Sequence, residues 1–417
     1  MPKHEATETK LDFVPSLSYC VNLFKTFQME IQIRHIKSVS PSFVGVLGVC
    51  LLKAGFTRDQ NVNQFILGNP RAWLGNAYHE VLRQLPYLGQ SSVSIEDEIQ
   101  ALWKRAIDVQ YKHVINHPLD QRFGYPERWP GYHLIYASLK FRIDQLLEKN
   151  ILSATFPGWD SNNNFAKPIR EKEFTAFGGK LKGRPDVVLE DKIIDYKSGN
   201  IFETEAEEIL NQVKQPYIQQ LRIYAYLVRE SLGFWPKSGL LLPLSGLGIE
   251  ITLNPHECEE EARNAVSLLD SYNKLVLTSH DPTFLAAPSR QTCTWCSYQI
   301  ICPAFWITVQ TGWSETLMDV QLEGPLTDNP RPVLGDTAYV LSIKVITGSI
   351  PLGNRVLPPL SPLIHPIVNS LKQGDLIRIV GLVVRQDGTV SLSNRTVISR
   401  IRDLPPVIVA SSGKNQL

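Results

Sequence analysis

The sequence predicts an α/β core followed by a small β-barrel at the C-terminal end. The first observation is a pair of β-favouring apolar runs, Val187–Leu189 and Ile193–Ile194, joined by a short charged link. The second is a set of helical patterns on both sides of that pair. The third is a change of character after Trp313, where short segments rich in β-branched residues follow one another. At 417 residues the chain is long enough for two or three domains.

Composition argues against a strongly charged or membrane-embedded protein. The chain has 42 Lys and Arg against 41 Asp and Glu, so no global basic field points to nucleic acid and any electrostatic footprint must be local. The longest apolar run, around Gly239–Leu244, is far shorter than a membrane span. No signal-peptide pattern is visible at the N-terminus, so we expect a cytoplasmic protein without a membrane partner.

A helix is predicted to begin at Ser40, ahead of the strands. Ser40 suits the N-cap position and Pro41 the first turn, because a helix start leaves that amide unpaired anyway. The apolar run Phe43–Leu52 follows and carries Cys50, which we place within this helix. Residues 1–37 are weakly patterned and are expected to form an N-terminal extension.

A second helix is predicted over Arg71–Leu85, where apolar residues recur at helical spacing. Gly75 and His79 are four residues apart and therefore share one face of it. On this pattern alone, His79 is more often an ordinary histidine of an amphipathic helix than a metal ligand.

The two apolar runs are predicted to pair as a hairpin whose turn is centred directly after Glu190. In that register Val188 faces Ile193 and Val187 faces Ile194. A longer loop with the same centre keeps this pairing, whereas a bulge shifts it by one residue.

Continuing the register brings Asp186 opposite Asp195, with Lys197 on the same face as Asp195 because strand side chains alternate. Two unpaired carboxylates this close repel each other, and a divalent cation with oxygen ligands removes the repulsion. The alternative is the solvent-exposed polar face of an ordinary hairpin, and the hairpin alone does not decide between them.

Residues on both sides of the hairpin extend the pattern. Lys182 and Arg184 add positive charge at the approach to it. A helix or helix pair predicted over 204–230 carries Gln220 and Tyr224 on one face, although an amphipathic helix with a buried tyrosine gives the same pattern.

Four motifs occur in an order that resembles the PD-(D/E)xK nuclease superfamily, most closely its RecB/Cas4-like branch, which includes the iron–sulfur nuclease domains of AddB and Dna2. They are G-x-x-x-H at 75–79, G-x-x-D at 183–186, D-x-K at 195–197 and Q-x-x-x-Y at 220–224. Each motif is weak alone, and together they make the resemblance specific. It covers residues 38–310 and implies a restriction-endonuclease-like core, a central mixed sheet flanked by helices.

The resemblance implies a magnesium- or manganese-dependent phosphodiesterase. Asp186 and Asp195 would hold the metal ion, with His79 and the Tyr196 backbone carbonyl as further ligands. Lys197 would orient or activate the attacking water and stabilise developing charge. The other implied roles are contact with phosphate or support of the lysine by Gln220 and Tyr224, and contact with nucleic acid by Lys182, Arg184 and Arg222.

The cysteines form a second pattern. Cys293, Cys296 and Cys302 have the compact spacing of metal ligands, and three thiolates need a fourth ligand to close a site. Cys50 is the best candidate for the fourth ligand, and Cys20 is its rival. The resemblance implies a [4Fe–4S] cluster that fastens both ends of the nuclease domain, while zinc and uncoordinated thiols stay open as alternatives.

Beyond Trp313 the sequence predicts a β-domain, with ten Lys and Arg against four Asp from Arg331 onward. Its strand opening at 374–381, Gly-Asp-x-x-Arg-x-x-Gly, resembles that of an OB-fold, a small barrel that binds single strands. Tyr339 is the only aromatic residue past Trp313, so a structural or partner-docking role stays open. The predicted strands are Val340–Thr347, Asp375–Arg385 and Thr389–Arg400, with Asp387-Gly388 as the turn between the last two.

We therefore expect an extension at 1–37, a nuclease domain with an iron–sulfur cluster at 38–313, an OB-like domain at 314–405 and a tail at 406–417. The expected activity is hydrolysis of single-stranded or end-bearing DNA, in DNA repair, recombination, or anti-phage or CRISPR defence. Two alternatives stay open: a nucleic-acid-binding scaffold whose site no longer cuts, and a nuclease that works only with a helicase, an integrase or another defence protein.

Overall fold

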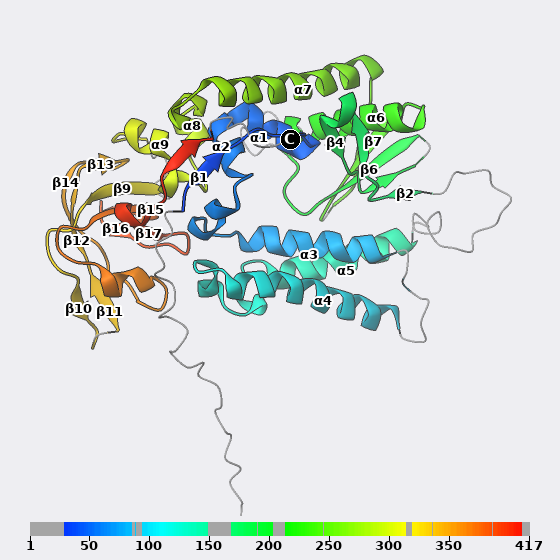
Figure 1. Ribbon diagram of the computed structural model, residues 1–417. Helices are drawn as coiled ribbons and strands as arrows, with labels where there is room; N and C mark the ends of the chain where they lie inside the picture. The colour runs from blue at the N-terminus through cyan, green and yellow to red at the C-terminus, as the bar shows by residue number, and fades with distance from the viewer. Residues whose placement is uncertain are drawn as a thin grey trace, which may run out of the picture.

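The computed structural model describes residues 29–85, 88, 94–148, 168–189, 191–202, 213–244, 246–313, 319–335, 337–385 and 387–410. Figure 1 shows a core of helices and strands beside a β-rich C-terminal part. A helix needs about 20 apolar residues to cross a bilayer, and none in the described ranges offers such a stretch. The α-helices are α1 (Pro41–Val49), α2 (Leu51–Phe56), α3 (Pro70–Gln84), α4 (Ile95–Asn116), α5 (Tyr132–Glu148), α6 (Gln215–Leu232), α7 (Pro255–Thr278), α8 (Arg290–Cys293) and α9 (Pro303–Thr308).

A five-stranded sheet forms the centre of the core, in the order β2-β5-β6-β7-β8. β6 pairs antiparallel with β5 and parallel with β7, so the sheet is mixed, as expected. A parallel pair needs a crossover connection, and α6 lies in the one between β6 and β7. The strands are β2 (Ile169–Arg170), β5 (Val187–Val188), β6 (Lys192–Lys197), β7 (Ser238–Pro243) and β8 (Ile249–Thr252).

Apolar side chains cover both faces of this sheet. Ile193 packs in the cluster that contains residues of α1, α6 and α7, while Ile194 packs in the cluster formed with α3, α4 and α5. Figure 1 shows α7 on one side and α3, α4 and α5 on the other. Because strand side chains alternate, Asp195 returns to the side of Ile193, where α6 lies.

The first helix begins as predicted, with Ser40 as N-cap and Pro41 in the first turn. The expectation that Cys50 lies within this helix is wrong. Cys50 has an extended backbone, with φ of −161° and ψ of 116°, and separates α1 from α2. Its thiol is therefore presented from a joint between two helices.

A second hairpin, β3–β4, stands beside the sheet and approaches α6 closely. A Cβ atom at Gly183, the last residue of β4, would lie 2.6 Å from Leu227 Cδ1 and 3.0 Å from Tyr224 Cε1, so glycine permits this contact. The remaining strands of the core are β1 (Ile31–Ile33), β3 (Phe174–Ala176) and β4 (Leu181–Gly183).

The C-terminal part is rich in strands, as predicted, and the turn at Asp387-Gly388 joins β15 to β16 with Val384 opposite Val390. β9, β13, β15, β16 and β17 form one sheet, and β10–β11 and β12–β14 form two pairs. Within the described residues these strands do not close into a barrel, so the expected OB-fold is not established. They are β9 (Val320–Pro325), β10 (Arg331–Val333), β11 (Ala338–Val340), β12 (Ser342–Val345), β13 (Thr347–Gly348), β14 (Gly353–Val356), β15 (Leu376–Val384), β16 (Val390–Ser391) and β17 (Val397–Arg400).

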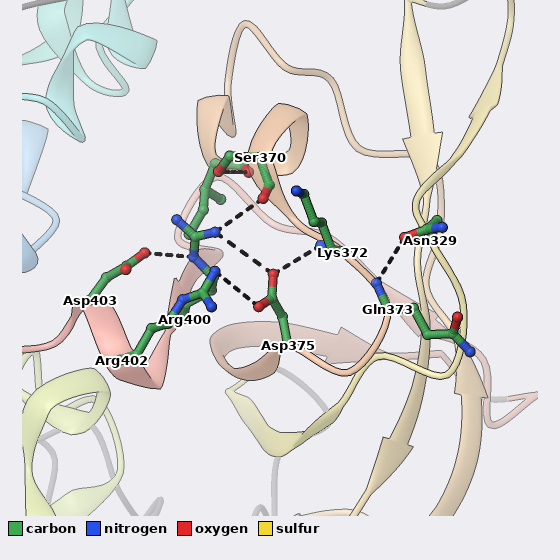
Figure 2. Close-up of polar contacts among 9 residues, drawn as sticks. Asn329, Ser370, Lys372, Gln373, Asp375, Arg400, Arg402 and Asp403 are labelled. Atoms are coloured by element: carbon green, nitrogen blue, oxygen red, sulfur yellow. Dashed lines mark hydrogen bonds and ion pairs between the residues drawn. The ribbon is translucent and has the colours of Figure 1, made fainter. Parts of the chain in front are cut away.

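The motif that suggested an OB-fold makes internal contacts (Figure 2). Asp375 accepts a hydrogen bond from the Lys372 amide at 2.9 Å and lies 3.2 Å from Arg402 and 3.7 Å from Arg400. Arg400 also donates to the Ser370 carbonyl. These charges hold the start of β15 against the end of β17.

Arg378 of the same motif faces the core. Its guanidinium pairs with Glu323 at 2.7 Å and lies 4.9 Å from the centre of the Trp306 ring in α9. Some of the basic residues of the C-terminal part therefore make structural contacts within the protein.

The two ends of the described chain meet in one small sheet. β1 pairs in parallel with β18 (Val407–Val409), drawn in red in Figure 1. β18 falls in the segment 406–417 that was expected to be a tail, of which residues 411–417 lie outside the described part. Residues 1–28 of the predicted extension also lie outside it.

Candidate active site

The β5–β6 hairpin has the predicted register. Val187 pairs with Ile194 and Val188 with Ile193. Glu190, on which the predicted turn is centred, lies outside the described residues. This register brings Asp186, the residue before β5, toward Asp195 near the end of β6.

Two carboxyl groups lie there, Asp195 buried and Asp186 half-buried. Asp186 Oδ2 accepts a hydrogen bond from the Tyr196 amide at 2.6 Å, and Asp195 is 3% exposed. Burial and then the neighbouring Asp195 raise the pKa of Asp186 to about 8. Burial also raises the pKa of Asp195, although the Lys197 ammonium opposes it. Two adjacent carboxyl groups in this setting favour a bound cation.

Lys197 follows on the same side of β6 and is held by three groups. Its Nζ lies 2.5 Å from Asp195 Oδ2 and donates to Gln220 Oε1 at 2.8 Å. It also lies 4.8 Å from the centre of the Tyr217 ring. The ammonium group is thus fixed beside the carboxyl pair, as the sequence predicted.

α6 supplies the groups behind the lysine. Gln220 Nε2 donates to the Tyr224 hydroxyl at 3.1 Å and lies 3.5 Å from Asp195 Oδ1. The Tyr224 hydroxyl donates to the Arg184 carbonyl at 3.2 Å. Gln220 and Tyr224 therefore link the lysine, the carboxylate and the strand entering the hairpin.

α3 closes the site from another side. A Cβ atom at Gly75 would lie 2.5 Å from Ser198 Oγ, so the helix approaches the residue after Lys197 closely. His79 lies one turn further along, and burial followed by the Lys197 charge lowers its pKa to about 4. A neutral imidazole at this position can act as a metal ligand.

The predicted basic residues do not all reach the site. Arg184 is exposed and Lys182 half-buried on the segment that leads into the hairpin. Arg222 instead pairs with Glu257 at 2.6 Å and approaches Glu261 at 3.8 Å, both on α7. The reason is helical geometry, because residues two apart lie on different faces of α6.

Two residues at the site were not singled out from the sequence. Tyr217 lies three residues before Gln220, so its place on the same face of α6 could have been inferred. Glu171 has a left-handed backbone, with φ of 47°, and its charge contributes to the raised pKa of Asp186. No local pattern predicts where a loop carboxylate of this kind will lie.

The four cysteines of the predicted cluster come together. Cys50, Cys293, Cys296 and Cys302 line one small cavity and form no disulfide. In the part of the chain that is described, no three His, Cys, Asp or Glu side chains are grouped as ligands of a single metal ion. Cys20, the rival fourth ligand, lies outside the described residues.

A family model described as the PD-(D/E)XK nuclease superfamily matches residues 38–303, more than half of the chain. Among solved structures the chain is similar to a protein named as an exonuclease from Eubacterium rectale, with 12% identity, 62% of this chain and 86% of that chain covered, and a TM-score of 0.32. It is also similar to the protein SSO0001, with 16% identity, 63% and 95% covered, and a TM-score of 0.23. No curated protein matches the sequence. Because the family model spans every motif from α1 to the cysteines, this chain belongs to the PD-(D/E)XK nuclease superfamily of hydrolytic nucleases.

Proposed function

We propose that the protein is a metal-dependent deoxyribonuclease of the RecB/Cas4-like type, acting on single-stranded or end-bearing DNA. The observation that carries this proposal is the meeting of Asp186, Asp195 and Lys197 at one end of the β5–β6 hairpin. A pair of carboxyl groups shielded from solvent to different degrees, beside a fixed ammonium group, matches the charge distribution that phosphodiester hydrolysis requires.

The residues present suit a magnesium or manganese ion. Asp186 and Asp195 offer hard oxygen ligands, His79 is close by, and the Tyr196 carbonyl is a further donor. Magnesium retains several water ligands, so two carboxylates are sufficient anchors. When bound, the ion would supply Lewis acidity and a bound water of lowered pKa.

The protein's own residues orient the reaction. In the proposed step a water oxygen bonds to phosphorus, one P–O ester bond breaks, and the leaving oxygen takes up a proton. Lys197 faces the developing negative charge and positions the water, while Gln220 and Tyr224 keep Lys197 in place. Lys182 and Arg184 contact the nucleic-acid backbone at the entrance to the hairpin.

Substitution of the charged groups tests the proposal. Asp195→Ala and Lys197→Ala should each lower the cleavage rate in magnesium or manganese by at least about a hundredfold, because each removes charge stabilisation in a dry site. The measurement is cleavage of end-labelled single-stranded DNA. Asp191→Ala removes an exposed carboxylate from the same hairpin and should cut normally. Undiminished cleavage by Asp195→Ala would show that the active site lies elsewhere.

We further propose a [4Fe–4S] cluster on Cys50, Cys293, Cys296 and Cys302. Support comes from their shared cavity and from the chemistry of the donors. In such a cluster each thiolate binds a different iron atom, so the sulfur atoms stand further apart than four ligands of one zinc ion. The proposal rests on this shared cavity and on the softness of the four thiolates, and zinc is the competing metal that the next experiment separates from the cluster.

The cluster proposal predicts a brown protein that contains iron and acid-labile sulfide when it is purified without oxygen. Cys302→Ala should lose most of both. Cys258→Ala removes a thiol that is buried in α7, away from the cavity, and should keep its iron. Stoichiometric zinc in a colourless wild-type protein would rule the cluster out.

A further inference from the structure

A cavity of about 490 Å³ lies between the core and the C-terminal part. Several segments that are far apart in the sequence line it: the start of α3 with the loop before it, the loop that follows α8, and the middle of β15 with the loop before β17, together with Phe123, Pro130 and Asp319. None of these segments belongs to the catalytic hairpin. The polar and aromatic lining includes Asn69, Arg71, Trp295, Asn394 and Arg395.

Trp295 is the unusual member of this lining. It is 45% exposed and has φ of 63°, a left-handed conformation that is uncommon for a tryptophan. Its amide donates to Asp319 Oδ2 at 3.1 Å, and this carboxylate is itself buried. The fold therefore holds a large aromatic ring at the edge of a cavity at a cost in backbone strain.

The charge around the ring is positive. The Arg395 guanidinium lies 4.5 Å from the centre of the Trp295 ring, and Arg71 lines the same cavity. Among the described residues of the lining, Asp319 is the only acidic one, and it is turned inward toward the Trp295 amide and the Gln299 side chain. An aromatic ring with a stacked guanidinium and a second arginine suits a base and its phosphate.

The cavity is connected to the active site by α3. Arg71, Gly75 and His79 follow one another at intervals of four residues on this helix, so they share a side. The eight steps from Arg71 to His79 span about 12 Å at the rise of an α-helix. That length corresponds to roughly three nucleotides of a stacked strand, and to fewer in an extended one.

We propose that this cavity binds an unpaired base of the substrate strand, a few nucleotides from the phosphate that is cut. The base stacks on the Trp295 and Arg395 pair, and Arg71 meets the backbone. Any base can stack on an aromatic ring, but only when it is not paired with a second strand. The site therefore selects single strands or frayed ends without recognising their sequence. The inference rests on the proposed nuclease function and adds a substrate subsite that the C-terminal part helps to build.

A measurement of DNA binding without cleavage tests this subsite independently of catalysis. In an Asp195→Asn background without divalent metal, Kd is measured by fluorescence anisotropy for a labelled oligothymidine and for a blunt duplex. Trp295→Ala should raise the Kd for the single strand about tenfold, the usual effect of losing one base–aromatic stack, and change the duplex Kd little. Trp295→Phe should restore most of the binding. A strand too short to span from the active site to the cavity should show no dependence on Trp295.

Arg395→Ala is the second variant. Arg395 lies on a different segment from Trp295, so this variant still tests the base-binding cavity if Trp295→Ala fails to fold. It should weaken single-strand binding, whereas Arg263→Ala, an exposed arginine on α7, should not. Equal Kd values for Trp295→Ala, Arg395→Ala and the parent would overturn the subsite, as would an equal loss on duplex. Failure of the nuclease assignment looks different, because it appears as undiminished cleavage by Asp195→Ala.

Discussion

Lys197 shows how a flexible side chain is fixed by its neighbours. A carboxylate, an amide oxygen and an aromatic ring surround the ammonium group, so rotamers that point it elsewhere lose three favourable contacts. Only the carboxylate comes from the same strand, and α6 provides the other two. The position of the Lys197 ammonium group is therefore determined by β6 and α6 together.

Gln220→Met tests this control of position. Methionine has a similar shape but no polar atoms, so Lys197 loses its amide partner while the packing of α6 is kept. We expect kcat to fall about tenfold or more with little change in KM, because misplacement affects the transition state more than substrate binding. Gln219→Met is the matched control, since Gln219 bonds Glu261 on the other side of the helix. A rise in KM alone would instead place Gln220 in substrate binding.

At the scale of single residues, the sequence predicted the members of the site better than their contacts. The hairpin register and strand alternation predicted that Asp186, Asp195 and Lys197 come together, and His79 was named through the motif resemblance; their catalytic roles stay predictions. Arg222 could not be placed correctly, since the acids of α7 that attract it are remote in the sequence. Contacts between distant segments are the part that local patterns do not contain.

At the scale of elements, glycines set how closely strands and helices approach. Gly183 ends β4 where the side chains of Leu227 and Tyr224 press against it. The same Tyr224 is hydrogen-bonded to Gln220, so the packing of β4 on α6 is coupled to the active site.

Gly183→Ala should therefore destabilise the protein by about 1–3 kcal/mol, because the added methyl group overlaps with packed side chains. Gly45→Ala is the comparison. Gly45 lies in α1 with open space at its Cβ position, so alanine there should be neutral or stabilising by about 0.5–1 kcal/mol. Urea denaturation measures both, and equal stability of the two variants would contradict the close approach.

The hairpin register was predictable because the short charged link between the two apolar runs fixes the centre of the turn, and the turn fixes which residues face each other. The break at Cys50 was not, since the apolar run Phe43–Leu52 has no proline and its two glycines, Gly45 and Gly48, both lie inside α1. Closure of the C-terminal strands into a barrel was expected and is not found in the described residues, because closure depends on register between strands rather than on their existence.

At the scale of the whole molecule, the core and the C-terminal part are joined by buried polar contacts. Arg122 donates to the Thr396 carbonyl at 2.6 Å, and its charge adds to the burial that lowers the pKa of His365 to about 4. His365 is 5% exposed and belongs to the C-terminal part. Its protonation would place two cations together at this junction.

Acid should therefore weaken the protein through His365. Between its unfolded pKa near 6.5 and about 4, the unfolded chain binds a proton that the folded chain excludes. The stabilisation is complete above pH 6.5 and is lost as the pH falls toward 4, at up to about 1.4 kcal/mol per pH unit. His365→Asn should flatten this part of the stability curve, measured by urea denaturation from pH 4 to 7. His256→Asn changes an exposed histidine of α7 and should leave the dependence of stability on pH unchanged. If the wild-type protein and both variants show the same dependence, His365 is not the group responsible.

The pairing of β1 with β18 also has a consequence for biosynthesis. Ile31 is made early and Val407 late, so the ribosome completes both the nuclease region and the β-rich region before this partner exists. Throughout that interval the nascent chain carries an open strand edge, the kind of surface on which chaperones act and aggregates begin. Val407–Val409 thus cover a strand, Ile31–Ile33, that is synthesised far earlier.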